Sequence, residues 1–368
     1  MFDEIFNRKR EENIDLTKYI KGKLPYLIHV AGTNGKGSTC SYLECVLMGK
    51  YKVGKFTSPH LFSPNERITI NQKQISNKEF FSYYDKFKHL KIGFFDFLFL
   101  IAMNYFIDNQ VDIAIIEVGI GGKYDSTNCL NYDVALITNV SYDHTNMLGN
   151  SIESIAFQKA GICKNNTLTF YTHNIKCLKD EIEKLTNNSK YITGTDKFKL
   201  PLSGKFQESN FALAYEVFKL FNLSDEFIQN GLKKFKLRGR QEKIRDNVYI
   251  DISHNEASFL ALKENFKNYD NLHIFLTSLL DKDIKSIYKI ASSFAKKVSV
   301  YPMPHIKRGR SKQNIIETLG NVDIIDDIYI DENCINIYCG SFYFISEIYD
   351  KLIIKNETYI SHKSKYSN

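Results

Sequence analysis

The chain has 368 residues, 43% hydrophobic and 25% charged, a composition typical of a folded globular protein rather than a disordered one. Its length suffices for two domains, each able to bury a core of its own. The formal net charge of +7 is compatible with nucleic acid, a phosphorylated cofactor or an anionic small substrate, but the lysines are scattered, which argues against a nucleic-acid-binding surface.

Neither end of the chain nor its apolar segments indicate export or membrane insertion. The N-terminal segment 1–13 is charged and lacks the apolar core of a secretory signal. The longest apolar stretch, 92–107, is interrupted by Asp96 and Asn104 and is shorter than a membrane span, so we predict a buried helix there. Seven cysteines, none in a CxxC pair, favour reduced thiols over disulfides or zinc. We therefore expect a cytoplasmic protein.

Short apolar runs alternate with segments of helical periodicity along the first two thirds of the chain. This alternation is typical of an α/β fold with a mainly parallel sheet. The predicted strands are 26–31, 52–56, 111–118, 133–140 and 168–171. The predicted helices are 37–48, 77–89, 94–108, 151–160, 208–221 and 224–235.

A basic turn at 237–240 follows, and the alternation then begins again. The predicted strands of this second part are 248–252, 272–277, 298–301 and 336–339, with helices at 256–268 and 284–296. We therefore predict two α/β domains, a larger one over residues 1–242 and a smaller one over residues 243–368.

A glycine-rich turn at 32–37 joins the first strand to the following helix. Its glycines allow backbone N–H groups to close around phosphate oxygens, and the helix N-terminus and Lys36 add positive charge. Gly37 separates Lys36 from Ser38 and Thr39, so the strict Walker pattern is not met. The alternative is a tight turn without a ligand, in which a lysine between two glycines has no packing purpose. We predict a phosphate-binding loop centred on Lys36, with Ser38 or Thr39 in reach of Mg²⁺.

Three polar residues, Ser58, Glu117 and His144, belong to segments at the C-terminal ends of predicted strands, the sheet edge where α/β proteins bind ligands. Glu117 ends an apolar strand, where a carboxylate is costly unless it meets a cation. Each residue alone is equally explained as a turn residue, a strand-end charge or a loop histidine, so the prediction rests on their shared position. Lys159, in a helix with one apolar face, is interpreted from the residues alone as extending to solvent.

Nine motifs in a fixed order then connect the sequence to a known family. They are HVAGTNGKGST at 29–39, TSPHL at 57–61, NERI at 65–68, EVGIGGKYDSTN at 117–128, TNVSYDHTNMLG at 138–149, IAFQKAGI at 155–162, RGRQE at 238–242, DISHN at 251–255 and CGSFY at 339–343. Over nearly its whole length the chain resembles the folylpolyglutamate synthase and dihydrofolate synthase family of the Mur ligase superfamily. It differs from the family pattern in having Lys123 for the usual Arg and Phe206 for the usual His.

The resemblance implies a P-loop ATPase domain at 1–242, of the Mur ligase type, and a Rossmann-like ligase domain at 243–368. The implied ATP contacts are Thr33, Asn34, Gly35, Lys36, Gly37, Ser38, Asn210, Arg240, Asp251 and His254. The implied Mg²⁺ ligands are Ser58 and Glu117 for one ion and His144 for a second. Lys159 would be carbamylated, which turns an ammonium into an anionic group that binds or orients metal. The implied substrate contacts are Phe95, Asp96, Tyr124, Asp125 and Ser126.

The implied activity is ATP-dependent ligation of L-glutamate to 7,8-dihydropteroate, to tetrahydrofolate, or to both, through an acyl phosphate. Lys36, Glu117, His144 and Lys159 would be the catalytic residues, because an acyl phosphate forms only where negative charge is offset. The alternatives are another Mur-type carboxylate–amine ligase and a nucleotide-binding homologue without catalysis. We expect a monomer whose partners are small molecules, without nucleic acid or membrane.

Overall fold

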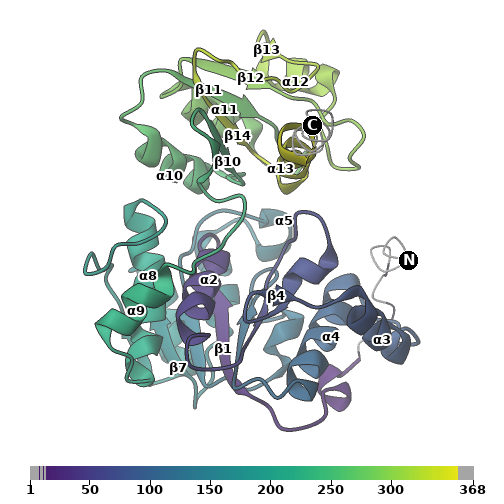
Figure 1. Cartoon of the computed structure of the whole chain (residues 1–368), viewed down its shortest axis with the longest axis vertical. Coiled ribbons are helices and arrows are strands. Elements are labelled where there is room, and N and C mark those ends of the chain that lie inside the picture. Colours follow the sequence, from purple (N-terminus) through teal and green to yellow (C-terminus); the bar gives the residue numbers. More distant parts are fainter. Residues whose placement is uncertain (1–7, 9–10, 12–13, 355–368) are drawn as a thin grey trace, which may run out of the picture. The chain divides into compact units, whose positions relative to one another are not determined.

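The computed structural model describes residues 8, 11 and 14–354. The chain divides into two compact units, Met1–Leu237 and Arg238–Asn368 (Figure 1). The division lies a few residues before the predicted boundary, because Gly239 already bonds within the second unit. Its N–H donates to Glu242 Oε2 over 2.6 Å, and its carbonyl accepts from Ile252 N over 2.8 Å.

The described part of the first unit contains an eight-stranded sheet with the order β4-β3-β2-β5-β1-β6-β7-β8. The strands are β1 Tyr26–Ala31, β2 Val53–Phe56, β3 Ile68–Ile70, β4 Lys73–Gln74, β5 Ile113–Glu117, β6 Val134–Ile137, β7 Leu168–Tyr171 and β8 Ser189–Tyr191. All neighbours pair in parallel except β2 with β3 and β3 with β4. The mainly parallel α/β fold predicted from the sequence is confirmed.

Helices cover both faces of this sheet (Figure 1). They are α2 Lys36–Leu47, α3 Asn77–Phe87, α4 Phe94–Asp108, α5 Thr145–Leu148, α6 Ile152–Ala160, α7 Lys176–Leu185, α8 Lys205–Leu220 and α9 Asp225–Leu232, with short 3₁₀ helices at Leu16–Tyr19, Pro64–Arg67 and Ser126–Cys129. Ile28 and Val30 of β1 pack with α2, α8 and α9, whereas Leu27 packs with α3 and α4, as the alternation of a strand requires. Because β1, β2, β5 and β6 run parallel to one another, their carboxyl ends share one edge of the sheet.

The apolar stretch that contains α4 is a buried helix, as predicted. Residues 97–103 are all 0% exposed, and Asp96 and Asn104 are buried beside them. None of the described helices combines the length and the hydropathy that a bilayer-spanning segment needs.

In the described part of the second unit a six-stranded sheet has the order β13-β12-β11-β14-β10-β9. Its strands are β9 Glu242–Arg245, β10 Val248–Asp251, β11 Leu272–Leu276, β12 Lys297–Val300, β13 Asp323–Ile324 and β14 Ile335–Cys339. Its helices are α10 Glu256–Phe266, α11 Ile284–Ser292, α12 Lys312–Leu319 and α13 Phe342–Ile348, and a π-helix follows at Tyr349–Ile354. Only β9 pairs antiparallel among these described strands.

Candidate active site

The glycine-rich loop turns tightly between β1 and α2. Gly35 caps α2 with φ of 87°, and a Cβ there would lie 2.2 Å from Asn210 Oδ1, so both the backbone conformation and the space require glycine. By contrast, a Cβ on Gly37 would meet nothing within 4 Å. The first turn of α2 therefore presents its N-terminus to open space, as an anion-binding helix end requires.

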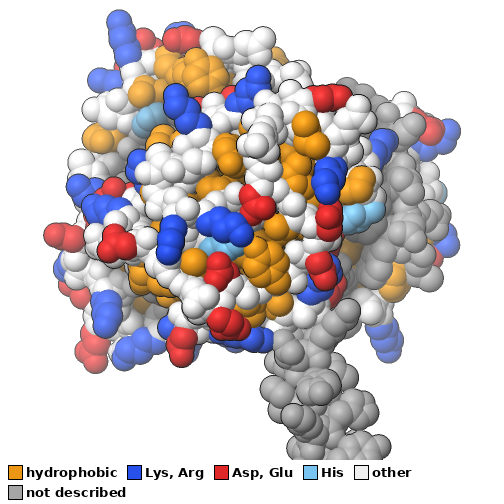
Figure 2. Space-filling model, turned by 90° about the horizontal axis from the view of Figure 1, so that it is seen from above, with side chains coloured by type: hydrophobic (Ala, Val, Ile, Leu, Met, Phe, Trp, Pro, Cys, Tyr) orange, Lys and Arg blue, Asp and Glu red, His pale blue; other side chains and the backbone are white. Residues whose placement is uncertain are grey.

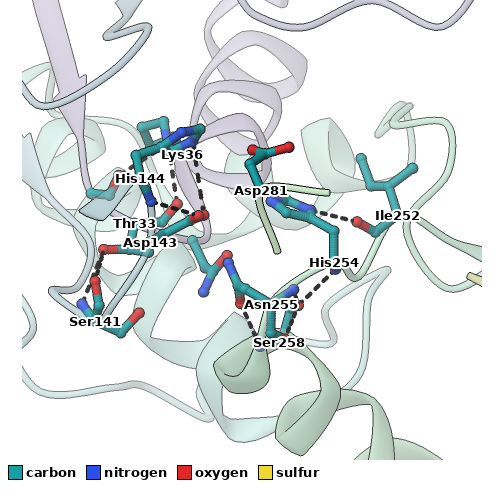
Figure 3. Close-up of polar contacts among 12 residues, drawn as sticks. Thr33, Lys36, Ser141, Asp143, His144, Ile252, His254, Asn255, Ser258 and Asp281 are labelled. Atoms are coloured by element: carbon teal, nitrogen blue, oxygen red, sulfur yellow. Dashed lines mark hydrogen bonds and ion pairs between the residues drawn. The ribbon is translucent and has the colours of Figure 1, made fainter. Parts of the chain in front are cut away.

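The loop is held from the side by the segment that follows β6. Thr33 N donates to Asn139 O over 3.0 Å, and Asn34 N donates to Asn139 Oδ1 over 2.9 Å. The hydroxyl of Thr33 donates to Ser141 O over 3.1 Å and accepts from Ser141 N over 3.0 Å (Figure 3). The sequence did not single out Asn139. These bonds hold the loop in its tight turn.

A second set of polar contacts supports the loop from α8. Gln207 Nε2 donates to Ser38 Oγ over 3.4 Å, and Asn210 Nδ2 donates to Gln207 Oε1 over 3.2 Å. Thr39 Oγ1 donates to the carbonyl of Asn210 over 3.3 Å. The predicted Asn210 therefore lies against the loop. Gln207 was missed as a functional residue, although a fully buried glutamine facing a phosphate loop is unusual.

One pocket brings three of the four predicted catalytic residues together. It is lined by Gly32, Thr33, Lys36, Gly119, Ile120, Gly121, Asp143, His144, Leu148 and Lys159. Within it the Lys36 ammonium folds back over the loop, donating to Gly32 O over 2.9 Å and to Thr33 O over 3.2 Å (Figure 3). Both acceptors are neutral carbonyls, so the lysine charge stays available to a phosphate.

Lys159 is only 3% exposed, so the interpretation that it extends to solvent is wrong. Burial lowers the pKa of Lys159 well below its ordinary value, the positive charge of Lys36 lowers it further, and Asp143 opposes the shift. An amine with a depressed pKa is available as a free base, which is the form that reacts with carbon dioxide to give a carbamate.

The predicted metal ligands Ser58 and Glu117 also meet. Their strands, β2 and β5, are parallel neighbours with Phe56 beside Ile116 in register. As a result the backbone N–H of Ser58 donates to Glu117 Oε2 over 2.9 Å, and the glutamate is only 3% exposed. A buried carboxylate at a strand end is suited to a hard divalent cation.

His144 caps α5 in the left-handed region, with φ of 50°, which is uncommon for a residue with a side chain. Its N–H donates to Asp143 Oδ1 over 2.8 Å, and its Nε2 lies 3.9 Å from Asp143 Oδ2 (Figure 3). The sequence did not single out Asp143, whose carboxylate faces the pocket. Among the described residues no three His, Cys, Asp or Glu side chains form a closed metal site. A Mg²⁺ site completed by water and phosphate oxygens needs no such cluster.

Four of the five predicted substrate residues lie beside Gly119 of the pocket, in direct contact with it or next to a residue that is. Phe95 packs so close to Gly119 that a Cβ on the glycine would lie 2.7 Å from its ring, and Ser126 Oγ donates to Asp96 Oδ1. Asp125 accepts from the backbone N–H groups of Gly119 and Ile120, each over 3.1 Å.

Tyr124, the remaining predicted substrate residue, points outward and is 71% exposed. Beside it the Lys123 ammonium lies 3.8 Å from the centroid of the Phe157 ring. Of the five predicted substrate residues, Tyr124 is thus the exposed one.

Three predicted ATP contacts belong to the second unit: Arg240 before β9, Asp251 at the end of β10, and His254 shortly after it. Asp251 accepts from Ser253 N over 2.8 Å and from Gln241 N over 2.9 Å. His254 Nδ1 donates to Ile252 O over 2.8 Å (Figure 3), and the Arg240 guanidinium lies 6.0 Å from the Phe342 ring. Their contact with ATP stays a prediction.

Comparison with known proteins extends these observations. Residues 30–189 match the family model of the Mur ligase middle domain. The chain is 29% identical over 394 residues to a dihydrofolate synthase/folylpolyglutamate synthase of Buchnera aphidicola, with 94% of each chain covered. It shares its fold with E. coli FolC in complex with ADP, at a TM-score of 0.87, 24% identity and 97% coverage of both chains.

A further solved structure is a bifunctional folylpolyglutamate synthase/dihydrofolate synthase with Mn, AMPPNP and L-glutamate bound. The similarity has a TM-score of 0.82 at 25% identity and covers 95% of this chain and 92% of that one. The similarity therefore spans both units.

Proposed function

Because the chain belongs to the dihydrofolate synthase/folylpolyglutamate synthase family of Mur-type ligases, we propose that it joins L-glutamate to dihydropteroate, to a folate, or to both, at the expense of ATP. The observation that carries the proposal is the convergence of Lys36, His144 and Lys159 on one pocket at the carboxyl edge of a parallel sheet.

ATP would bind with its phosphates on the loop 33–38, because this loop is held in its tight turn and the start of α2 is open. Two divalent cations, which we propose are Mg²⁺, would be held here, one by the Ser58–Glu117 pair and a second by His144. Lys159, which we propose is carbamylated, would bind or orient metal. The oxygen and nitrogen atoms of these residues suit Mg²⁺ or Mn²⁺. When bound, the metal ion would stabilise the negative charge of the transferring phosphoryl group.

The chemistry proceeds in two displacements. The substrate carboxylate attacks the γ-phosphorus, a carboxyl O–P bond forms, and the bond to ADP breaks while Lys36 offsets the charge on the phosphoryl oxygens. The glutamate amine then attacks the acyl carbon, and the C–O bond to phosphate breaks. The amine loses a proton as the amide forms.

Small molecules rather than nucleic acid are the proposed partners. On the face shown in Figure 2, Lys and Arg side chains are interspersed with Asp and Glu instead of forming a continuous basic stripe. All seven cysteines carry free thiols, which is usual for proteins of a reducing compartment, so we propose a cytoplasmic protein. The monomeric state that we propose rests on the family resemblance alone.

The test is ATP-dependent phosphate release with glutamate and Mg²⁺, offering dihydropteroate, tetrahydrofolate or a muramyl acid in parallel, with products identified by mass. Turnover with dihydropteroate alone, with tetrahydrofolate alone or with both defines the step. Turnover with the muramyl acid alone would overturn the folate assignment in favour of another Mur-type ligase. Absence of turnover in all three would indicate a nucleotide-binding homologue.

A further inference from the structure

His29 begins the motif that contains the phosphate loop, yet it has no role in the site described so far. It lies in the middle of β1, and its ring is 0% exposed. The ring stacks on Tyr132 with 3.9 Å between centroids and 11° between planes. Its Nε2 lies 2.8 Å from Thr127 Oγ1, and its buried Nδ1 has no hydrogen-bond partner among the described residues. An unpaired buried acceptor costs stability, so packing alone would favour an apolar aromatic ring here.

The direction of the His29 hydrogen bond follows from the neighbouring groups. Asp125 Oδ1 accepts from Thr127 N over 3.0 Å and from Thr127 Oγ1 over 2.5 Å. The threonine hydroxyl has a single proton, and it donates this proton in the hydrogen bond to the Asp125 carboxylate. Thr127 Oγ1 must therefore accept from His29, which assigns the imidazole proton to Nε2.

The ring is a permanent donor rather than a pH switch. Burial and the positive charge of Lys164 lower the pKa of His29 to about 3, so the imidazole is neutral at physiological pH. Thr127 is fixed a second time by Tyr132, whose hydroxyl donates to the Thr127 carbonyl over 2.6 Å.

The chain of bonds ends at the pocket. Asp125 Oδ1 is held by Thr127, and Asp125 Oδ2 holds the N–H groups of Gly119 and Ile120, two residues of the pocket wall. We propose that His29 is a positioning residue of the ligase site: through Thr127 and Asp125 it fixes the wall 119–121 against which the acid substrate binds. This inference rests on the proposed function for the identity of that substrate, but its structural part does not.

The test removes the chain of bonds at two points. His29→Phe keeps a stacked ring and removes only the Nε2 donor. Thr127→Val keeps the side-chain volume but removes both the acceptor for His29 and the hydroxyl that donates to Asp125. His29→Gln restores an N–H donor at a similar reach. Ile28→Val is the matched control, because Ile28 is the neighbouring buried residue of β1 and the change removes packing but no hydrogen bond.

In His29→Phe we expect the KM for the acid substrate to rise about threefold to tenfold, which is the effect of losing one hydrogen bond. The KM for ATP should stay within about twofold of the wild-type value. Amide exchange at Gly119 and Ile120 should accelerate by a similar factor in the free enzyme. Thr127→Val should have an effect at least as large, because it also removes the hydroxyl bond to Asp125. The double variant should be no worse than Thr127→Val, and His29→Gln should recover part of the loss seen in His29→Phe. Ile28→Val should change neither quantity.

Unchanged amide exchange in His29→Phe would overturn the proposal, and so would an equal rise in both KM values or the same effect in Ile28→Val. If the wild-type protein ligates no folate acid, the proposed function fails, but the exchange rates of Gly119 and Ile120 still decide whether His29 holds the wall.

Discussion

Replacing Lys159 by methionine should make the free protein more stable and abolish its activity. The side chain is 3% exposed, and both burial and the charge of Lys36 disfavour its ammonium form. Each unit by which folding depresses a pKa costs about 1.4 kcal/mol at a pH below the folded value. Methionine has a similar length and no charge, so we expect Lys159→Met to raise the free energy of unfolding by about 1–3 kcal/mol at neutral pH.

The pH dependence has a definite sign. Because the folded pKa of Lys159 is depressed, the unfolded chain binds more protons between the folded value and about 10.4, and the stability contributed by this residue rises with pH through that window. Denaturant melts in carbonate-free buffer from neutral pH to about pH 10 should show this rise in the wild type and lack it in Lys159→Met. Lys176→Met, at an exposed lysine, is the control and should keep the rise.

Two results would refute this reasoning. A Lys159→Met protein that is less stable than wild type across the whole pH range would show that the ammonium is not penalised by its surroundings. A variant with the wild-type kcat would remove Lys159 from the catalytic residues.

Three other substitutions test separate parts of the structure. Gly35→Ala should raise the KM for ATP at least about tenfold, because an L-residue at this φ costs about 1–2 kcal/mol and its Cβ would meet Asn210. A nucleotide titration that gave the wild-type affinity for ATP would contradict this. Glu117→Gln keeps an acceptor for the Ser58 N–H but loses the negative charge. The Mn²⁺ affinity measured by calorimetry should therefore fall about 10–100-fold, with the melting temperature unchanged. An unchanged affinity would exclude Glu117 as a metal ligand. Lys55→Met should cost about 3–5 kcal/mol in denaturant melts, since Lys55 lies 2.5 Å from the buried Glu44 carboxylate; a cost below about 1 kcal/mol would mean that Glu44 is not left charged.

The sequence predicted best those elements whose local pattern and tertiary role coincide. The helix at Phe94–Asp108 has the bounds predicted, because its apolar run and its buried position have the same cause. The strand predicted at 133–140 ends instead at Ile137, because Thr138 and Asn139 leave the strand to bond with the phosphate loop. That change depends on contacts between distant segments, which no local pattern contains.

Two of the missed elements, α7 and β9, have charged sequences with few apolar residues. In α7 two buried residues, Leu178 and Ile182, four positions apart, form the apolar stripe, and this spacing was the available signal. Strand β9, with the sequence EKIR, lies at a sheet edge where half-exposed charged residues are tolerated. Such edge strands exist because a neighbour offers pairing, so the sequence alone specifies them poorly.

The candidate site was predicted as a set of motifs rather than as a geometry. The motifs gave Lys36, Glu117 and Lys159 directly, whereas Gln207, Asp143 and Asn139 emerged only when the chain was folded. These three act by supporting or facing residues from other segments. Supporting residues of this kind lack a spacing signature, because their partners are distant in sequence.

The most direct test of the central claim is to supply dihydropteroate and tetrahydrofolate labelled with ¹⁸O in the reacting carboxylate, together with ATP, L-glutamate and Mg²⁺. We predict a product extended by one glutamyl residue, with one ¹⁸O atom transferred to the released phosphate for each amide formed. A glutamylated product whose phosphate carries no label would contradict the acyl phosphate route, and the absence of any glutamylated product would contradict the assignment as a folate ligase.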